Sequence, residues 1–253
     1  MFVGAPHYVL TPENLVWGPD LSASVAIFSK PNSYRCRERA DAIEYGSMRR
    51  KKERLPGTAP RDGYATFLDP LLARLRSRRI QPHIRRGSSL LDIGCGMGEL
   101  LFGLADLLYQ GVGIDQRTED KTVGNIRLMA GRIDTVLPFA DASFDAVSLL
   151  AVLEHLERPD AILREIRRVL RPGGTILITV PTIYAKPVLE FLAFRLHLIS
   201  REGVADHKRY YRKAALAADL EQAGFAIERI RYFEMGFNLF AAGQRPADAR
   251  VDA

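Results

Sequence analysis

Three glycines at alternate positions, Gly94, Gly96 and Gly98, follow a short apolar run over residues 89–93. The run is suited to a buried parallel strand, and the leucines that follow have helical spacing, at positions 100, 101, 104, 107 and 108. A strand that turns through glycines into a helix presents free backbone N–H groups to a ligand. We therefore expect this loop to bind a ligand, with glycines because a Cβ atom would hold the ligand away from the backbone.

Two acidic residues accompany the loop. Asp92 lies at its mouth, and Asp115 closes the next apolar stretch, 112–115. An acid about 20 positions after a glycine loop is well placed to accept hydrogen bonds from ribose hydroxyls, which predicts a nucleoside-bearing ligand. The glycine spacing is not the Gly-x-Gly-x-x-Gly of dinucleotide sites, so a nicotinamide dehydrogenase is the weakest alternative. The Asp92 carboxylate favours instead the cationic amino-acid end of a sulfonium cofactor.

Four segments in order carry a family resemblance. Residues 90–98 read LLDIGCGMG, and LPFADASFD, LEHL and LRPGG follow at 137–145, 153–156 and 170–174. They resemble the motifs of class I S-adenosylmethionine-dependent methyltransferases of the type 11-like kind, over about residues 65–245. The resemblance implies S-adenosylmethionine as cofactor, held by a set of residues around the loop and the following strands: Asp92, Gly94, Cys95, Gly96, Gly98, Asp115, Gln116, Ile133, Asp134 and Ala151. Cys95 itself is interpreted as a small residue chosen for packing, not as a nucleophile.

The adenine end of this site departs from the family pattern. The family often places an acid near the adenine amino group, and here either Asp134 takes that role or Ile133 supplies only an apolar wall. The interval 116–125 is also too short for the helix that the family usually has there. That side of the pocket is then more open, or is covered by the N-terminal extension.

Methyl transfer from a sulfonium is an in-line displacement, and a base is needed only where the acceptor must lose a proton. His155 and His207 are the candidate catalytic residues, because both lie on segments expected to flank the open end of the sheet. The structural alternatives are that His155 braces its loop and that His207 holds Arg209 or Tyr210. Residues 206–211 resemble a segment of methyltransferases that act on saccharides and other small molecules. No metal ligand set is expected.

The leading hypothesis is a methyltransferase that acts on an oxygen of a small molecule or saccharide. The net charge of +6 suits nucleic acid, anionic lipid or a phosphorylated substrate, but also an ordinary arginine-rich surface. An RNA methyltransferase is the first alternative, although nucleic acid is not the favoured partner: the strand ending at Leu150 lacks the Asn/Asp-Pro-Pro-Tyr segment of amino-methylating DNA enzymes. The second is a cofactor-binding scaffold without catalysis.

The cysteine count and the N-terminal sequence bear on the compartment. The two cysteines, Cys36 and Cys95, lie far apart and without metal-ligand company, which indicates reduced thiols and a cytoplasmic setting. Residues 1–18 lack the pattern of a secretory signal, and no stretch reaches the roughly 20 apolar residues of a membrane span.

The alternation of strands and helices predicts an α/β fold with a Rossmann-like, doubly wound, mostly parallel seven-stranded sheet and a final antiparallel strand. We expect an irregular N-terminal extension over 1–62, a methyltransferase domain over 63–245 and a tail over 246–253. Residues 181–211 form an expected lid or substrate-side insertion, with a broad apolar face over 187–199. Self-association into a homo-oligomer and peripheral contact with a membrane are the alternatives for that face.

Overall fold

The computed structural model describes residues 68–133 and 136–247. These residues form one eight-stranded sheet in the order β3-β4-β2-β1-β5-β6-β8-β7. The expected extension over 1–62, Cys36 and Asp134 lie outside the described residues. The strands are β1 Ser89–Ile93, β2 Gln110–Asp115, β3 Lys121–Val123, β4 Ile126–Ala130, β5 Phe144–Leu150, β6 Leu170–Pro181, β7 Ala226–Phe233 and β8 Asn238–Gln244.

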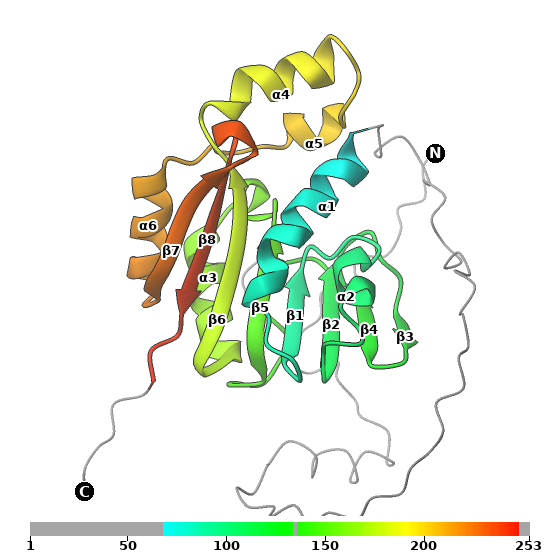
Figure 1. The fold of residues 1–253 in the computed structure, drawn as a ribbon, viewed down its shortest axis with the longest axis vertical. Coiled ribbons are helices and arrows are strands. Elements are labelled where there is room, and N and C mark those ends of the chain that lie inside the picture. Colours follow the sequence, from blue (N-terminus) through cyan, green and yellow to red (C-terminus); the bar gives the residue numbers. More distant parts are fainter. Residues whose placement is uncertain (1–67, 134–135, 248–253) are drawn as a thin grey trace, which may run out of the picture.

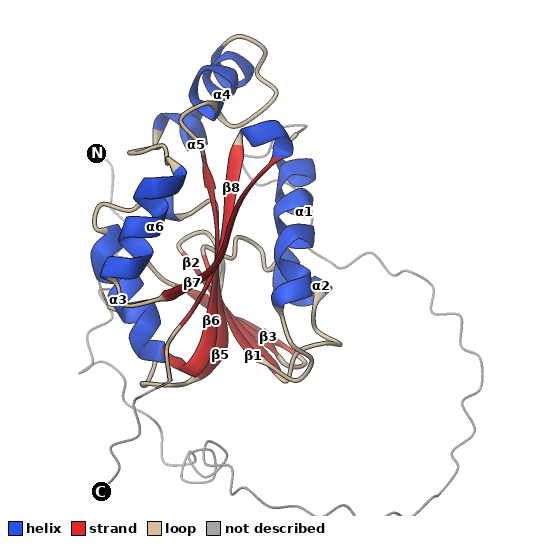
Figure 2. Ribbon diagram, turned by 60° about the vertical axis from the view of Figure 1, so that its left-hand side comes forward, coloured by secondary structure: helices blue, strands red, loops and turns tan. Residues whose placement is uncertain are grey.

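Helices cover both faces of the sheet, as Figure 2 shows. α1 (Asp69–Ile80) and α2 (Glu99–Gly103) lie on one face, and α3 (Pro159–Val169) and α6 (Lys213–Gln222) on the other. α4 (Ala185–Phe194) and α5 (Arg201–Ala205) lie beyond one end of the strands (Figure 1). Short 3₁₀ turns complete the set: η4 Gln81–His83, η5 Leu153–His155 and η6 Glu234–Gly236. The doubly wound α/β architecture is therefore confirmed.

The two faces bury separate apolar clusters. On the α3 side, Ile162, Ile166 and Val169 follow the helical repeat and pack with Leu216 and Leu220 of α6 and with inward side chains of the sheet. α1 is different, because Ile80 is its only fully buried residue. The helices on one face thus each bury a row of apolar residues, whereas α1 covers the other face with mostly exposed and half-buried side chains.

Two details of the elements differ from the sequence-based expectations. The sheet has eight strands because the interval after β2 forms β3, which pairs antiparallel with β4 in place of a helix. The predicted helix through Leu108 ends at Gly103, where the N–H of Leu104 is shared between the carbonyls of Leu100 and Leu101. The leucines at 104 and 108 are still buried, so the apolar spacing predicted burial correctly but the helix length wrongly.

β1 is the central strand at which the chain changes direction across the sheet. It pairs in parallel with β2 on one side and with β5 on the other. In open α/β sheets, ligands bind at the carboxyl ends of the strands on either side of such a point. The glycine loop that follows Ile93 begins at this position. The topology therefore places the predicted ligand loop at the switch point of the sheet.

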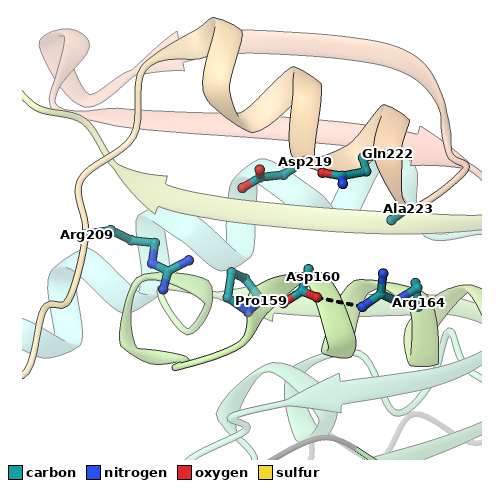
Figure 3. Close-up of a pocket in the computed structure, with 7 residues that line it drawn as sticks. All are labelled: Pro159, Asp160, Arg164, Arg209, Asp219, Gln222 and Ala223. Carbon is teal, nitrogen blue, oxygen red and sulfur yellow. Dashed lines mark hydrogen bonds and ion pairs between the residues drawn. The ribbon is translucent and has the colours of Figure 1, made fainter.

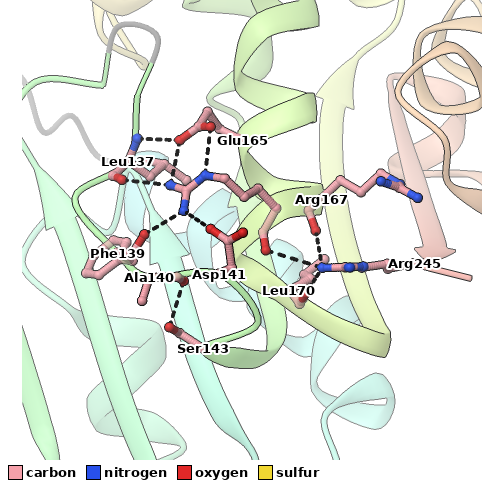
Figure 4. A network of polar contacts seen from close by, with 10 residues as sticks. Leu137, Phe139, Ala140, Asp141, Ser143, Glu165, Arg167, Leu170 and Arg245 are labelled. Carbon is pink, nitrogen blue, oxygen red and sulfur yellow. Dashed lines mark hydrogen bonds and ion pairs between the residues drawn. The ribbon is translucent and has the colours of Figure 1, made fainter. Parts of the chain in front are cut away.

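The LPFADASFD segment has a structural role in this fold (Figure 4). Arg168 of α3 donates to both carboxylate oxygens of Glu165, to Asp141 and to the carbonyls of Leu137 and Phe139. Ser143 Oγ donates to the carbonyl of Ala140 at 2.7 Å. The guanidinium of Arg168 therefore holds the loop that leads into β5 against α3. Asp141 and Ser143 of the motif form hydrogen bonds that stabilise the same loop.

The two edge strands of the sheet, β3 and β7, are short or charged. β3 is three residues long and fully exposed, and β7 carries exposed Glu228, Arg229 and Arg231. Within residues 68–133 and 136–247, no helix is both long enough and apolar enough to cross a lipid bilayer.

Candidate functional site

The glycine loop is closed by its own hydrogen bonds. The N–H groups of Gly94 and Cys95 donate to the carbonyl of Ile114, and that of Gly98 donates to Cys95. The expectation of free N–H groups is therefore wrong for these positions. A pyrophosphate needs such donors, whereas a cationic cofactor needs carboxylates, so the loop fits the second better than the first.

Packing explains most of the glycines in the loop. All three have positive φ angles. A Cβ atom on Gly94 would lie 2.3 Å from Val152 Cγ2, and one on Gly98 would lie 2.9 Å from Leu128 Cδ2. Only Gly96 faces open space, where its nearest neighbour would be Glu99 Oε2 at 3.7 Å. The ligand-approach argument thus applies to Gly96, while Gly94 and Gly98 are required by neighbouring side chains.

Asp115 closes β2 and is tied to the loop. It is 4% exposed. Its Oδ2 accepts the N–H of Gly96 at 2.9 Å, and its Oδ1 accepts the N–H of Arg117 at 2.8 Å. Arg117 Nε adds a longer contact at 3.5 Å. A carboxylate offers about four acceptor positions, so one remains for a ribose hydroxyl.

Asp92 is the second carboxylate of the loop. It lies opposite Ser148 in the register of β1 and β5, and Ser148 Oγ donates to its Oδ1 at 2.7 Å. Burial raises the pKa of Asp92 to about 7, against the hydrogen bond from Ser148, which lowers it. A buried carboxylate of this kind gains a favourable partner when a cationic group binds beside it. We call Asp92, Asp115 and the loop 94–98 the cofactor side.

The remaining predicted cofactor residues have diverse environments. The thiol of Cys95 packs against Gly113 of β2, and burial raises its pKa, as expected for a packing residue. Gln116 is exposed, and Ile133 is half-buried against the core. Ala151, directly after β5, has a φ of 56°. Alanine rarely adopts this left-handed conformation, and such strain tends to occur at functional sites.

The chain after β5 joins the cofactor side to a second polar region. Val152, which touches Gly94, immediately precedes η5. η5 presents Glu154 and His155, and the segment after α5 brings His207 beside them, with the two imidazole centroids 4.8 Å apart. The two predicted histidines, 52 positions apart in the chain, therefore lie together at the edge of the sheet. We call Glu154, His155 and His207 the acceptor cluster.

Each histidine of the cluster has a polar partner on one ring nitrogen. His155 Nδ1 lies 3.0 Å from Asp206 Oδ2, and His207 Nδ1 lies 3.0 Å from the hydroxyl of Tyr210. Burial lowers the pKa of both rings, for His207 to about 4, while Asp206 opposes the shift at His155. Both imidazoles are therefore neutral at pH 7.

Glu154 is the member of the cluster that sequence reasoning did not single out. It is 0% exposed, and neither carboxylate oxygen has a hydrogen-bond partner. Burial raises its pKa to about 7, while its own backbone N–H and, to a smaller extent, the charge of Arg76 on α1 act in the opposite direction. Its position in the LEHL segment was the available signal, but its burial is set by tertiary packing, which the segment alone does not show.

A small polar pocket lies elsewhere, between α3 and α6 (Figure 3). Its volume is about 60 Å³, and its lining includes Asp160, Arg164, Arg209 and Asp219. Arg209 donates to the carbonyls of Leu156 and Glu157. Arg209 therefore stabilises the chain after η5 through these two hydrogen bonds. The pocket itself is too small for a nucleoside.

Comparison with known proteins agrees with this geometry. A methyltransferase domain family model matches residues 64–230. A ubiquinone biosynthesis O-methyltransferase of Xanthomonas axonopodis pv. citri is 31% identical over 178 residues, which cover 64% of this chain and 72% of the relative. A ubiquinone/menaquinone biosynthesis C-methyltransferase of Vibrio parahaemolyticus is 31% identical over 183 residues, covering 60% and 68%.

Solved structures share the fold. The 1,6-didemethyltoxoflavin-N1-methyltransferase of Burkholderia thailandensis, solved with its substrate and S-adenosylhomocysteine, has a TM-score of 0.54 and 17% identity, over 70% of this chain and 80% of that one. The family match spans most of the described residues, and both sides of the site fall within it. The chain therefore belongs to the methyltransferase domain family and is a class I S-adenosylmethionine-dependent methyltransferase.

Proposed function

We propose that this enzyme methylates a hydroxyl oxygen of a small, largely apolar molecule. The observation that carries the proposal is the contact between the two sides of the site. His155, paired with Asp206, follows Val152 by three residues, and Val152 touches Gly94 of the cofactor loop. A base beside the cofactor loop is the arrangement that an acceptor hydroxyl requires, because the hydroxyl must lose its proton.

The residues of the cofactor side suit the two ends of the cofactor. Asp92 would face the amino-acid end, Asp115 would accept from the ribose, and the open face of Gly96 would lie against the ligand. When bound, S-adenosylmethionine supplies a methyl group that the positive sulfur has already activated. The task left to the chain is to hold the acceptor oxygen in line with that methyl group.

His155 is the proposed base and Asp206 its positioning residue. With Nδ1 donating to Asp206, the lone pair of Nε2 is free to take the proton. The lowered pKa makes this imidazole a weak base, so a hydroxyl that ionises readily is favoured. A phenolic hydroxyl, with a pKa of about 10, gives up its proton more easily than the hydroxyl of a saccharide. The proposed acceptor is therefore a hydroxylated aromatic compound.

Exposed apolar side chains favour an apolar acceptor. Large apolar side chains are exposed on α1 and in the 181–211 insertion: Leu71, Leu75, Tyr184, Phe191, Phe194 and Leu196. The N–H of Leu68, just before α1, donates to the carbonyl of Leu198, which links the two elements. The relatives that act in ubiquinone biosynthesis favour the same substrate class. We propose that α4 and α5 form a lid over the acceptor.

A methyl-transfer assay tests the acceptor. The enzyme is given S-adenosylmethionine with an isotopically labelled methyl group and a panel of catechols, hydroxylated quinones, glycosides and RNA. Labelled O-methyl aromatic products, identified by NMR, are expected; label on a ring carbon would indicate the C-methyl chemistry of the second relative. Label in RNA or in glycosides alone would contradict the proposal.

Two variants separate binding from catalysis. His155→Gln should lower turnover by about 10²-fold or more, the usual contribution of a general base, with unchanged affinity for S-adenosylhomocysteine. Asp115→Ala should weaken that affinity about 10- to 100-fold in calorimetric titration, because a charged acceptor is lost. Glu221→Gln, at an exposed position of α6 outside both sides of the site, is the control and should change neither. NAD binding in place of the adenosyl ligands would contradict the cofactor assignment.

A further inference from the structure

The acceptor cluster contains one group that the proposed base does not use. Glu154 is fully buried, its two carboxylate oxygens have no partner, and two imidazoles lie beside it. Burying a carboxylate is unfavourable unless it is protonated, paired with a cation or bound to a metal ion. Arg76 is the cation whose charge reaches Glu154, but it makes no hydrogen bond to the carboxylate.

We propose that Glu154, His155 and His207 form a binding site for a divalent transition-metal ion. One ligand atom from each of these residues lies within 4.8 Å of the others. Ligand atoms at about 2.0–2.2 Å from a tetrahedral ion are about 3.4 Å apart, so a closure of at most about 1.4 Å would complete the site.

The hydrogen bonds at Nδ1 of the two histidines orient both rings as metal ligands. Asp206 accepts from Nδ1 of His155 at 3.0 Å, and the hydroxyl of Tyr210 lies 3.0 Å from Nδ1 of His207. In the tautomer in which Nδ1 of each ring donates to its partner, Nε2 of each ring carries the free lone pair that a metal ion needs. Metal-bound histidines have this arrangement, with a carboxylate or another acceptor on the opposite ring nitrogen.

The donor set selects the kind of ion. Two imidazole nitrogens and one carboxylate suit Zn²⁺, Fe²⁺ or Co²⁺, whereas Mg²⁺ prefers oxygen ligands and retains its waters. Three protein ligands leave a fourth position open, as in catalytic zinc sites. Given the proposed function, an acceptor hydroxyl at that position would lose its proton to solvent more readily, and His155 would then act as a ligand in place of a base.

Cobalt titration tests the site directly. The full chain, without a polyhistidine tag, is stripped with a chelator and titrated with Co²⁺, whose visible absorption reports nitrogen coordination; Zn²⁺ and Mg²⁺ then compete. One Co²⁺ per chain is expected, displaced by Zn²⁺ and not by Mg²⁺. Glu154→Gln and His207→Gln should weaken binding by about 100-fold or more, and Asp206→Asn about 10- to 100-fold. His197→Gln should bind as the parent protein does.

Cofactor binding provides the folding control, because all four variants should bind S-adenosylhomocysteine with unchanged affinity. Absence of Co²⁺ absorption, or equal Co²⁺ affinity in Glu154→Gln, would overturn the proposal and leave Arg76 as the partner of Glu154. Failure of the proposed function has a different signature: Co²⁺ binds at the cluster, but no hydroxylated acceptor is methylated with or without metal.

Discussion

The two sides of the site satisfy their polar groups in different ways. On the cofactor side, Asp115 accepts the N–H of Gly96 and Asp92 accepts the hydroxyl of Ser148. In the acceptor cluster, the carboxylate of Glu154 is equally buried but has no partner. Burial raises the pKa of Asp92 and of Glu154 alike, to about 7 in both cases. The two sides therefore differ in the hydrogen-bond partners of their carboxylates and not in how deeply these carboxylates are buried.

This contrast indicates how far the structure of each side depends on a ligand. The loop of the cofactor side is held by its own hydrogen bonds, so its shape does not depend on a ligand. The acceptor cluster is assembled from η5 and the segment after α5, and its carboxylate, that of Glu154, has no hydrogen-bond partner. A hydrogen-bonded glycine loop beside a cluster with an unpaired carboxylate fits the proposal that the first binds the cofactor, which the family shares, and the second the acceptor, which differs between its members.

The largest expected effect comes from breaking the contact that joins the two sides. Gly94→Ala combines a φ of +74° with a Cβ atom 2.3 Å from Val152 Cγ2. We expect a loss of unfolding free energy of about 2–4 kcal/mol in urea denaturation and no measurable S-adenosylhomocysteine binding. Adding Val152→Ala removes the steric part and should recover some of the stability. Unchanged stability in Gly94→Ala would mean that the contact is not tight.

A pH titration sharpens the comparison on the cofactor side. Because the pKa of Asp92 is about 7, its carboxyl is protonated at lower pH and cannot pair with the ammonium group at the amino-acid end of the cofactor, which S-adenosylhomocysteine also carries. Affinity for S-adenosylhomocysteine should rise up to about tenfold per pH unit below pH 7 and level off above it. Asp92→Asn should remove this dependence and bind more weakly. A parent protein with constant affinity from pH 5.5 to 8.5 would contradict the assignment.

The same shift predicts the sign for stability. The folded pKa of Asp92 lies above the unfolded value of 3.8, so the folded state retains the proton between about pH 4 and 7. Asp92 therefore contributes stability below this window that is lost as the pH rises through it. Asp92→Asn should flatten this part of the stability profile in calorimetric unfolding experiments without cofactor.

The smallest effect is expected from a change outside both sides. Arg168→Lys keeps the charge but removes the two-pronged contact with Glu165 and the bonds to the 137–141 loop. We expect a loss of about 1–2 kcal/mol in unfolding free energy, with unchanged S-adenosylhomocysteine affinity. A loss of affinity would show that this loop belongs to the cofactor side after all.

The sequence predicted the fold well, because its signals are local, whereas the residues assigned to the cofactor side remain a prediction. Apolar runs marked β1, β2, β5 and β6, and the loop with its two acids lies within 24 residues. The errors arose where one local sequence pattern was compatible with two different structures. Leucines at 104 and 108 have helical spacing but lie in turns after Gly103, and Gly94 is required by Val152, not by a ligand.

The acceptor cluster was only half predictable. The LEHL and 206–211 segments identified His155 and His207 separately, but nothing in either segment indicated that their rings lie 4.8 Å apart. That distance depends on the path of the chain through α4 and α5. The positive charge that acts on the buried carboxylate of Glu154 comes from Arg76 on α1, 78 positions away in sequence. Contacts of this kind are set by tertiary packing and leave no local signal.

The two outer strands have a consequence for how copies of this chain can meet. An open sheet offers unpaired backbone groups at each end, where another strand could add and start aggregation. Here one edge strand, β3, has only three residues, and the other, β7, carries Glu228, Arg229 and Arg231 on its exposed surface. Short or charged edges discourage such addition. Addition of another strand at either edge of the sheet is thus disfavoured. We expect any association between copies of this enzyme to use its helices instead.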